Sequence, residues 1–355
     1  MSGKNQHYLP RFMLAGFASR RDGKQAWIYE LRKGRQAVER NTRNVGAEGG
    51  FYRRGDDDRI DHELQDYEGE FGQLVNEIRS TDRIPTGSDD ALAGLVTSLS
   101  VRTRAIRLAF GHAGQQIVAA LGRYLNDPER VRRMMRDHLK KHPETLLEPV
   151  ARELGVDPHD LPLVLRNRLL QQAEGLIDAP ATTAKIKMLA GMMLRELEGR
   201  TSKEGIKEIH LTALGKGTLP SRRMDPAQRL TWSLRTLDPS SLILGDLGPI
   251  RLNESSGRYE SLAKATDDPH SIFLPISHEH LLVGVDHHLA TDCPLDVEAV
   301  NIAAAELSWE FVVARQSTKR EAVYAEALGR WAELLPDDEL HQIEEEVFGK
   351  VTAED

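Results

Sequence analysis

The feature that most constrains the fold is a change of hydrophobic period near residue 60. Before it, segment 26–31 partly alternates between apolar and polar side chains, and Lys33-Gly34 offers a turn into a second strand at 36–40. After it, apolar residues recur at spacings of three and four, which defines one face of an amphipathic helix. This stripe consists of Ile60, Leu64, Tyr67, Phe71, Leu74, Val75 and Ile78. Strand and helix patterns in separate blocks are typical of the α+β class.

Helical patterning continues to about residue 200. A polar cluster at 88–90 predicts the N-cap of a helix that runs to about residue 110. Residues 115–200 are expected to be wholly helical, in segments separated by X-Pro boundaries, because proline disfavours a helical residue before it and suits the first helical position. These boundaries are Asp127-Pro128, His142-Pro143, Asp157-Pro158 and Ala179-Pro180.

Strand character returns after residue 220. Segments 230–234, 241–244, 271–275 and 280–285 predict a small antiparallel sheet, and 299–315 predicts a helix. The sequence therefore predicts an α+β fold in which the N-terminal hairpin and the C-terminal strands build one small antiparallel sheet around a large inserted helical bundle. Three regions follow: 1–58 with a short helix at 10–17 and the hairpin, 59–218 helical, and 219–355 packing with 1–58. Segment 44–52 is expected to be irregular.

Composition excludes several classes of protein. Cys293 is the single cysteine among 355 residues, which excludes an internal disulfide and a cysteine-rich zinc site. Such low cysteine usage is typical of a reducing compartment. We expect Cys293 to be a buried thiol. No apolar run approaches 18 residues and the first 24 residues lack a signal-peptide core, so we expect a cytoplasmic protein without membrane contact. Glycine-rich phosphate loops and dinucleotide fingerprints are absent in usable context, and the sequence identifies no cofactor.

The net charge of −8 conceals an asymmetry along the chain. Residues 1–55 carry twelve lysines and arginines against four acids, whereas the last twenty residues are acidic. A basic end favours nucleic acid or another phosphate-bearing ligand as partner. The alternative interpretation is a solvated basic face that pairs with the acidic C-terminal helix.

Two residues near the N-terminus form the first candidate site. Leu9, at the expected N-cap, has no side-chain acceptor, so the first N–H groups of the helix need another partner. An anion there would meet Arg11, and His7 beside it could act as general acid or base at neutral pH. The structural alternative is that His7 ties down the N-terminus while Arg11 pairs with a carboxylate.

Carboxylates supply the remaining candidates. Asp246 follows a strand and lies in a glycine-flanked turn, from which its carboxylate could reach a cleft. The alternative is an ordinary turn aspartate without a functional role. Asp61 and Glu68 lie two turns apart on one helix face, and they could hold a metal only with further oxygen ligands. Pairing with Arg102 or Arg104 of the next helix is the simpler interpretation.

Four histidines raise the question of zinc. The four residues lie on both sides of the strand predicted at 280–285, but they lack the i, i+4 spacing of a hydrolytic zinc motif. The sequence therefore does not determine whether the protein binds a metal. They are His278, His280, His287 and His288.

Short motifs occur in an order that points to one bacterial family. Early ones are His7-Tyr8-x-Pro10, Phe17, Trp27-Ile28-Tyr29, Asn44-Val45, Phe51-Tyr52, Ile60-Asp61 with Leu64 and Glu68, and Arg102-Thr103. Later ones are Trp232, Leu244-Gly245-Asp246-Leu247-Gly248-Pro249, Leu274-Pro275-Ile276-Ser277 and the segment 301–315. With these motifs the chain resembles the family called domain of unknown function 4238 over most of its length, with 120–220 variable. It departs from the family pattern at Asp61, where glutamate is expected, and in the turn around Asp246.

The resemblance implies an architecture and a short list of residues, but no reaction. Our first hypothesis is a phosphodiester-directed hydrolase, a nuclease acting on RNA or DNA. In it His7 is acid or base, Arg11 and Arg102 stabilise the phosphate, and Asp246 orients His7 or holds a metal. The alternative is a non-catalytic module that binds nucleic acid or protein, in a prophage or defence context, where His7 and Asp246 only support the fold. The sequence does not determine the oligomeric state.

Overall fold

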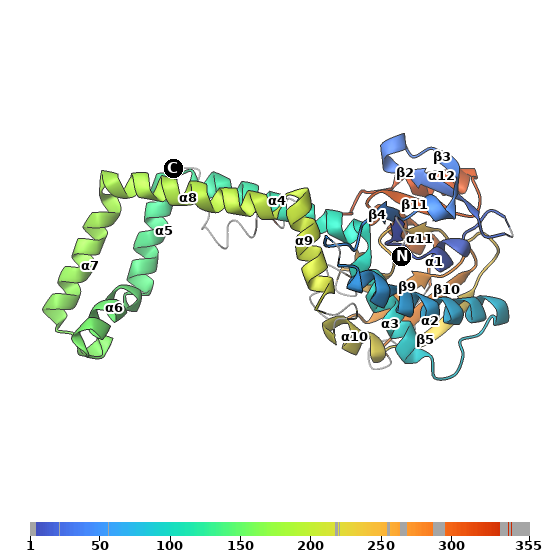
Figure 1. Ribbon diagram of the computed structural model, residues 1–355, viewed down its shortest axis with the longest axis horizontal. Helices are drawn as coiled ribbons and strands as arrows, with labels where there is room; N and C mark the ends of the chain where they lie inside the picture. Colours follow the sequence, from blue (N-terminus) through green and yellow to red (C-terminus); the bar gives the residue numbers. More distant parts are fainter. Residues whose placement is uncertain are drawn as a thin grey trace. The chain divides into compact units, whose positions relative to one another are not determined.

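The computed structural model describes residues 5–20, 22–55, 57–216, 219, 221–253, 256–262, 268–286, 295–333, 340 and 342. The chain divides into two compact units, which we describe separately (Figure 1). Unit 1 comprises residues 1–112 and 206–334, and unit 2 comprises residues 113–205 with 335–355. No helix in the described ranges combines the length and apolar character needed to cross a bilayer.

In the part of unit 1 that the structure describes there are three antiparallel sheets, and they confirm the α+β class. The four-stranded sheet has the order β3-β2-β11-β6, with β2 at Gln25–Glu30, β3 at Ala37–Asn41, β11 at Phe311–Ala314 and β6 at Leu244–Gly245. The five-stranded sheet has the order β5-β10-β9-β7-β8, with β5 at Thr231–Thr236, β10 at His280–Val285, β9 at Ser271–Pro275, β7 at Ile250–Asn253 and β8 at Arg258–Ser261. Strand β1 (Asn5–His7) pairs with β4 (Ala47–Gly49). The predicted hairpin therefore exists and joins strands from the C-terminal half.

The helices of unit 1 pack against these sheets. The predicted stripe of α2 faces inward, since Leu64, Phe71, Val75 and Ile78 are all buried. These residues share one hydrophobic core with the strands, so α2 and α3 belong with the sheets and the compact units do not divide the chain at residue 58. The helices are α1 (Arg11–Ala15), α2 (Arg59–Thr81), α3 (Asp89–Arg102), α4 (Arg104–Leu125, which continues into unit 2), α9 (Lys203–Leu214, which begins in unit 2), α10 (Ser221–Gln228), α11 (Val297–Glu306) and α12 (Lys319–Glu326).

Three local predictions were wrong. Thr103 adopts an extended conformation and ends α3, so the helix predicted from residue 88 to about 110 is two helices. The helix predicted at 299–315 ends at Glu306, because the buried run Phe311–Ala314 pairs with β2 on one side and β6 on the other. Segment 44–52 is not wholly irregular, because it contains β4, the partner of β1.

Unit 2 is helical, and its segment boundaries follow the X-Pro pattern. Each predicted proline lies at or just before the start of a helical segment, and the Asp127 side chain accepts hydrogen bonds from the N–H groups of Glu129 and Arg130 at the start of α5. The segments after α4 are α5 (Pro128–Lys141), α6 (Glu144–Leu154), a short 3₁₀ turn (Pro158–Asp160), α7 (Leu163–Asp178) and α8 (Pro180–Arg200).

Candidate functional site

Arg102 ties the N-terminal strand to α2. Its guanidinium donates to the carbonyl oxygens of His7 at 3.2 Å and Tyr8 at 3.5 Å, and it forms an ion pair with Glu68. The side chain is only 1% exposed. The predicted pairing of Glu68 with the next helix is thus confirmed, whereas Asp61 is buried and accepts a hydrogen bond from Gln65. Arg102 is placed to position His7, and its burial keeps it from direct contact with a ligand in solution.

His7 is half-buried at the end of β1. Its Nε2 lies 3.2 Å from the carbonyl oxygen of Arg43. Because a carbonyl only accepts, Nε2 carries the proton and Nδ1 keeps a lone pair. Burial lowers the pKa of His7, and the guanidinium groups of Arg11 and Arg102 lower it further against the opposing effect of Glu68. The imidazole is therefore neutral at pH 7, with one ring nitrogen able to accept a proton.

Arg11 is exposed in the first turn of α1, which begins after Pro10, one residue later than predicted. Its charge reaches His7, because it lowers the pKa of that ring. Arg43 is also exposed, at the turn whose carbonyl contacts His7. We refer to His7, Arg11, Arg43, Glu68 and Arg102 as the His7 cluster.

Several other basic residues of the N-terminal region pair with acids of unit 1. This local pairing supports a solvated basic face for that part of the region, and Arg11 and Arg43 are not among these pairs. The acids of the last twenty residues, which the interpretation expected as partners, lie outside the described residues. The ion pairs are Arg20–Glu39, Lys33–Glu30, Arg40–Glu30 and Arg54–Glu208.

Asp246 is not part of the His7 cluster. Its carboxylate is buried and accepts hydrogen bonds from three consecutive backbone N–H groups, those of Trp309 at 2.8 Å, Glu310 at 2.7 Å and Phe311 at 3.2 Å. Burial raises its pKa to about 7, although these backbone donors oppose the rise. The carboxylate thus holds the connection between α11 and β11, and neither of its oxygens is directed to His7.

Tyr8 indirectly links His7 and Asp246, which the first hypothesis placed in one site. Its carbonyl accepts from Arg102, and burial together with the charges of Glu310 and Asp246 raises the pKa of its phenol. The ring packs on Phe51, with centroids 5.1 Å apart. The His-Tyr motif therefore places the imidazole of one residue in the cluster and the phenol of the next in the core.

The Phe51-Tyr52 motif braces the N-terminal strand from the other side. The backbone N–H of Tyr52 donates to Gln6 at 2.6 Å, and its hydroxyl donates to the carbonyl of Arg102 at 3.1 Å. The guanidinium of Arg107 lies 3.5 Å from the centre of the Phe51 ring. These contacts fix β1, so the motif acts on His7 through its backbone.

Arg107 also engages a histidine that the sequence did not single out. Its Nε donates to Nδ1 of His210 at 3.0 Å, and Nε2 of His210 donates to the carbonyl of Val101 at 2.8 Å. Burial lowers the pKa of His210 to about 4, and the charge of Arg107 adds to the effect. His210 is thus a neutral ring held between two helices.

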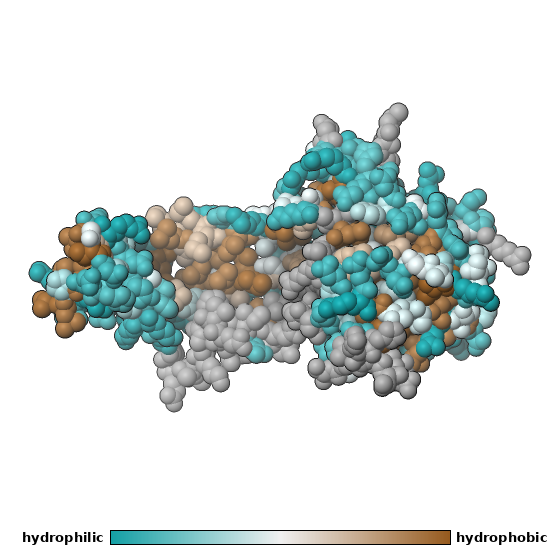
Figure 2. All heavy atoms as spheres, turned by 90° about the horizontal axis from the view of Figure 1, so that it is seen from below, coloured by the Kyte–Doolittle hydropathy of each residue, from teal (hydrophilic) through white to brown (hydrophobic). Residues whose placement is uncertain are grey.

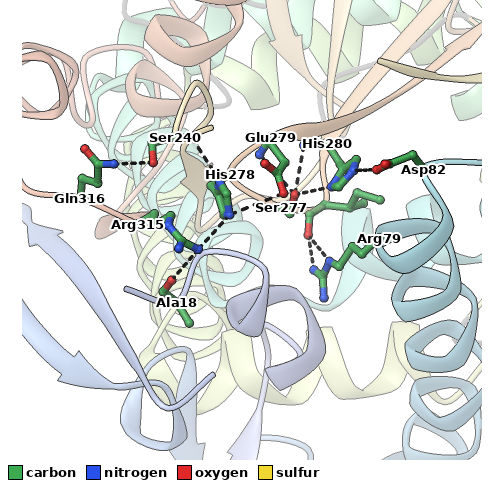
Figure 3. Close-up of polar contacts among 11 residues, drawn as sticks. Ala18, Arg79, Asp82, Ser240, Ser277, His278, Glu279, His280, Arg315 and Gln316 are labelled. Atoms are coloured by element: carbon green, nitrogen blue, oxygen red, sulfur yellow. Dashed lines mark hydrogen bonds and ion pairs between the residues drawn. The ribbon is translucent and has the colours of Figure 1, made fainter. Parts of the chain in front are cut away.

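The turn between β9 and β10 carries a second polar network (Figure 3). The Ser277 hydroxyl lies 2.7 Å from Nδ1 of His280, whose Nε2 lies 2.6 Å from the Asp82 carboxylate, the order of a hydrolytic Ser-His-Asp array. Ser277, however, is buried and also accepts from the backbone N–H groups of Glu279 and His280. With both lone pairs used and only 4% of the residue exposed, this hydroxyl stabilises the turn and is not placed to act as a nucleophile. His280 joins the turn to Asp82 at the end of α2.

The zinc interpretation finds no support at His278 and His280. Nδ1 of His278 accepts from the Ser240 backbone N–H at 3.1 Å and its Nε2 lies 2.9 Å from Arg315, so the two rings belong to different contacts (Figure 3). Within the described ranges, no group of three or more His, Cys, Asp or Glu side chains could hold a metal ion. The remaining candidates, His287, His288 and Cys293, lie outside the described residues.

Comparison with known proteins gives a family match. The family model described as protein of unknown function (DUF4238) matches residues 5–318, which includes the His7 cluster, Asp246 and the turn at 277–280. No curated protein and no solved structure matches the chain.

Proposed function

We propose that this chain, which belongs to the DUF4238 family of proteins of unknown function, is a phosphodiester-directed hydrolase, a nuclease that acts on RNA or DNA at the His7 cluster. One observation carries the proposal. A neutral imidazole with a free Nδ1 lone pair lies within the electrostatic reach of an exposed guanidinium, that of Arg11. A neutral histidine can take a proton at pH 7, and a guanidinium binds phosphate oxygens.

Each member of the cluster has a chemical role in this proposal. Nδ1 of His7 takes a proton from the attacking water, whose oxygen bonds to phosphorus while the P–O bond to the leaving nucleoside breaks. Arg11 binds the phosphate and offsets the charge that develops on it. Glu68, which raises the pKa of His7, stabilises the imidazolium that forms. The leaving oxygen takes its proton from solvent.

Two predicted residues change role in this scheme. Arg102 is a positioning residue, since it contacts Glu68 and the backbone of His7 and is sealed from solvent. Asp246 has no part in the chemistry, because its oxygens bind the backbone of residues 309–311. Arg43, exposed beside His7, extends the phosphate contacts along the backbone of the nucleic acid.

Cleavage assays with end-labelled RNA and DNA, each single- and double-stranded, test the role of His7 as the general base. His7→Gln should lower the cleavage rate by roughly 10²–10⁴-fold, the contribution expected of a general base. His62→Gln is the matched control, because its ring is largely exposed on α2. The rate of the wild type should fall as the pH drops through the lowered pKa of His7, since only the neutral ring can accept a proton. An unchanged rate for folded His7→Gln would remove the proposed base.

Binding measurements separate the enzyme from the non-catalytic module. Arg11→Ala should weaken nucleic-acid binding and flatten its dependence on salt, whereas Arg235→Ala, an exposed arginine on β5, should not. Salt-dependent binding that responds to Arg11→Ala, without cleavage of any of the four substrates, would favour the binding module. Absence of both binding and cleavage would reject the nuclease and a module that binds nucleic acid, and it would leave a protein partner as the alternative.

A further inference from the structure

Helix α8 carries an apolar surface that the described helices of its own unit leave exposed. Four large apolar positions on one side of the helix are more than half exposed, at 58% for Met188, 55% for Leu189, and 54% for both Met192 and Met193. Hydrophobic surface is plainly visible along the helical part of the chain in Figure 2. Isolated exposed apolar residues are ordinary, but a contiguous group of this kind marks an interaction surface.

The opposite face of α8 makes the contacts within unit 2. Ala190 is only 5% exposed, and a Cβ on Gly122 of α4 would lie 3.8 Å from the Leu194 side chain. Ala190 and Leu194 lie one turn apart on one face, and the exposed methionines lie on the other. The apolar surface is therefore additional to the packing that holds the helices of unit 2 together.

The residues of the exposed face are arranged symmetrically about the midpoint between Ala190 and Gly191. Met188 and Met193 lie at equal distances in sequence from that midpoint, as do Leu189 and Met192. Lys185 and Glu196 form the next symmetric pair on the same stripe, and they carry opposite charges. Positions 185, 189, 192 and 196 have the 4-3-4 spacing of a helix–helix seam.

We infer that α8 is an interface between two copies of this chain, in which the two α8 helices pack antiparallel around a two-fold axis near the midpoint 190–191. In such an isologous interface each residue meets its symmetric counterpart, so the four apolar side chains of both copies meet at the centre. Lys185 of each copy then faces Glu196 of the other, which gives two ion pairs at the ends of the seam.

Charge supports a second copy over other occupants of this surface. A lipid surface selects basic residues beside the apolar face of a helix, whereas a glutamate, Glu196, lies on the apolar stripe of α8 itself. Glu196 already pairs with Arg200 at 2.8 Å, and both side chains are 67% exposed. An exposed pair of this kind is weak, so the carboxylate is available to a lysine from a second chain. Antiparallel self-pairing satisfies both ends of the seam at once.

The mass of the full-length protein in solution, measured from about 1 µM to about 1 mM, tests the interface over the range in which a weak dimer becomes populated. The wild type should shift from monomer to dimer, and Met192→Glu should stay monomeric with an unchanged circular dichroism spectrum. Leu176→Glu, a control at a 65% exposed leucine on α7, should dimerise like the wild type. A wild type that stays monomeric over the whole concentration range would overturn the inference. A monomeric wild type that floats with anionic vesicles would overturn it too, in favour of a lipid surface.

A charge exchange tests the antiparallel register. Lys185→Glu and Glu196→Lys should each weaken dimerisation by about fivefold or more, because each creates two like-charge pairs. The double variant restores opposite charges and should recover dimerisation toward the wild-type value. Dimerisation that is insensitive to the single variants, or a double variant that is weaker than both, would contradict this arrangement.

Discussion

The Asp246 carboxylate accepts a hydrogen bond from the backbone N–H of Trp309 at 2.8 Å, across 63 positions of sequence. Two further N–H groups, of Glu310 and Phe311, complete the set of donors. The carboxylate therefore closes the end of α11 and sets the start of β11, which pairs with the N-terminal hairpin. The most prominent carboxylate of the sequence is thus a structural anchor between distant segments.

Substitution of this anchor should reduce stability in a pH-dependent way. Asp246→Asn places an amide NH₂ against one of the three N–H donors, and an unpaired buried donor costs roughly 1–3 kcal/mol. Because burial raises the pKa of Asp246 to about 7, the folded state holds a proton there that the unfolded state releases above its normal pKa near 4. The contribution of Asp246 to the free energy of unfolding therefore falls as the pH rises from about 4 to about 7. Urea unfolding across that range measures it.

The asparagine variant lacks this titration, so the stability gap between wild type and Asp246→Asn should narrow as the pH rises from 4 to 7. Asp66→Asn, at an exposed aspartate on α2, should show no such trend. A gap that instead widens with pH would mean that the three N–H groups keep the carboxylate ionised.

Local features could be predicted from the sequence, and long-range contacts could not. The stripe of α2 and the X-Pro boundaries of unit 2 depend on residues within a few positions of one another. The contact between Asp82 and His280 joins positions 198 apart, and no local pattern in the chain indicates it. The pairing of Glu68 with Arg102 was predictable because adjacent helices bring few alternatives within reach.

The role of Asp246 lay beyond the sequence for a related reason. A turn aspartate in a glycine-flanked segment has the same local pattern whether its carboxylate faces a cleft or a distant backbone. The deciding partners, the N–H groups of residues 309–311, exist only because the predicted helix at 299–315 ends at Glu306. Tertiary pairing of β11 therefore determined both the secondary structure and the fate of the carboxylate.

His210 should give the opposite pH dependence to Asp246. Its pKa is lowered to about 4 in the folded state against about 6.5 when unfolded, so the unfolded state binds the proton more readily. Stability should fall as the pH drops from about 6.5 to about 4, by about 3 kcal/mol from this group. The glutamine of His210→Gln can accept from Arg107 and donate to Val101, and it does not titrate. The variant should therefore lose about 3 kcal/mol less unfolding free energy than the wild type between about pH 6.5 and about pH 4. His62→Gln serves as control, and an equal acid dependence in all three proteins would contradict the prediction.

The Arg102–Glu68 pair should be asymmetric in its contribution to stability. Arg102→Leu removes the donor that the Glu68 carboxylate and the carbonyls of His7 and Tyr8 share, which we expect to cost about 3–5 kcal/mol. Glu68→Gln should cost less, because the Glu68 side chain is 28% exposed and an amide oxygen can still accept from the guanidinium. Glu70→Gln, exposed on the same helix, is the control. Urea unfolding measures all three, and equal losses for the two members of the pair would contradict a buried anchoring role for Arg102.

Two glycines should respond to alanine with opposite signs. Gly284 pairs with Trp232 across β10 and β5, and a Cβ at Gly284 would lie 2.9 Å from the Trp232 ring. Gly284→Ala should therefore displace the buried indole and cost about 1–3 kcal/mol. Gly69 lies exposed in α2, and a Cβ there would have no neighbouring atom within 4 Å, so Gly69→Ala should stabilise by roughly 0.5–1 kcal/mol. Thermal unfolding followed by tryptophan fluorescence measures both, and a neutral Gly284→Ala would show that strand β5 yields without loss of packing.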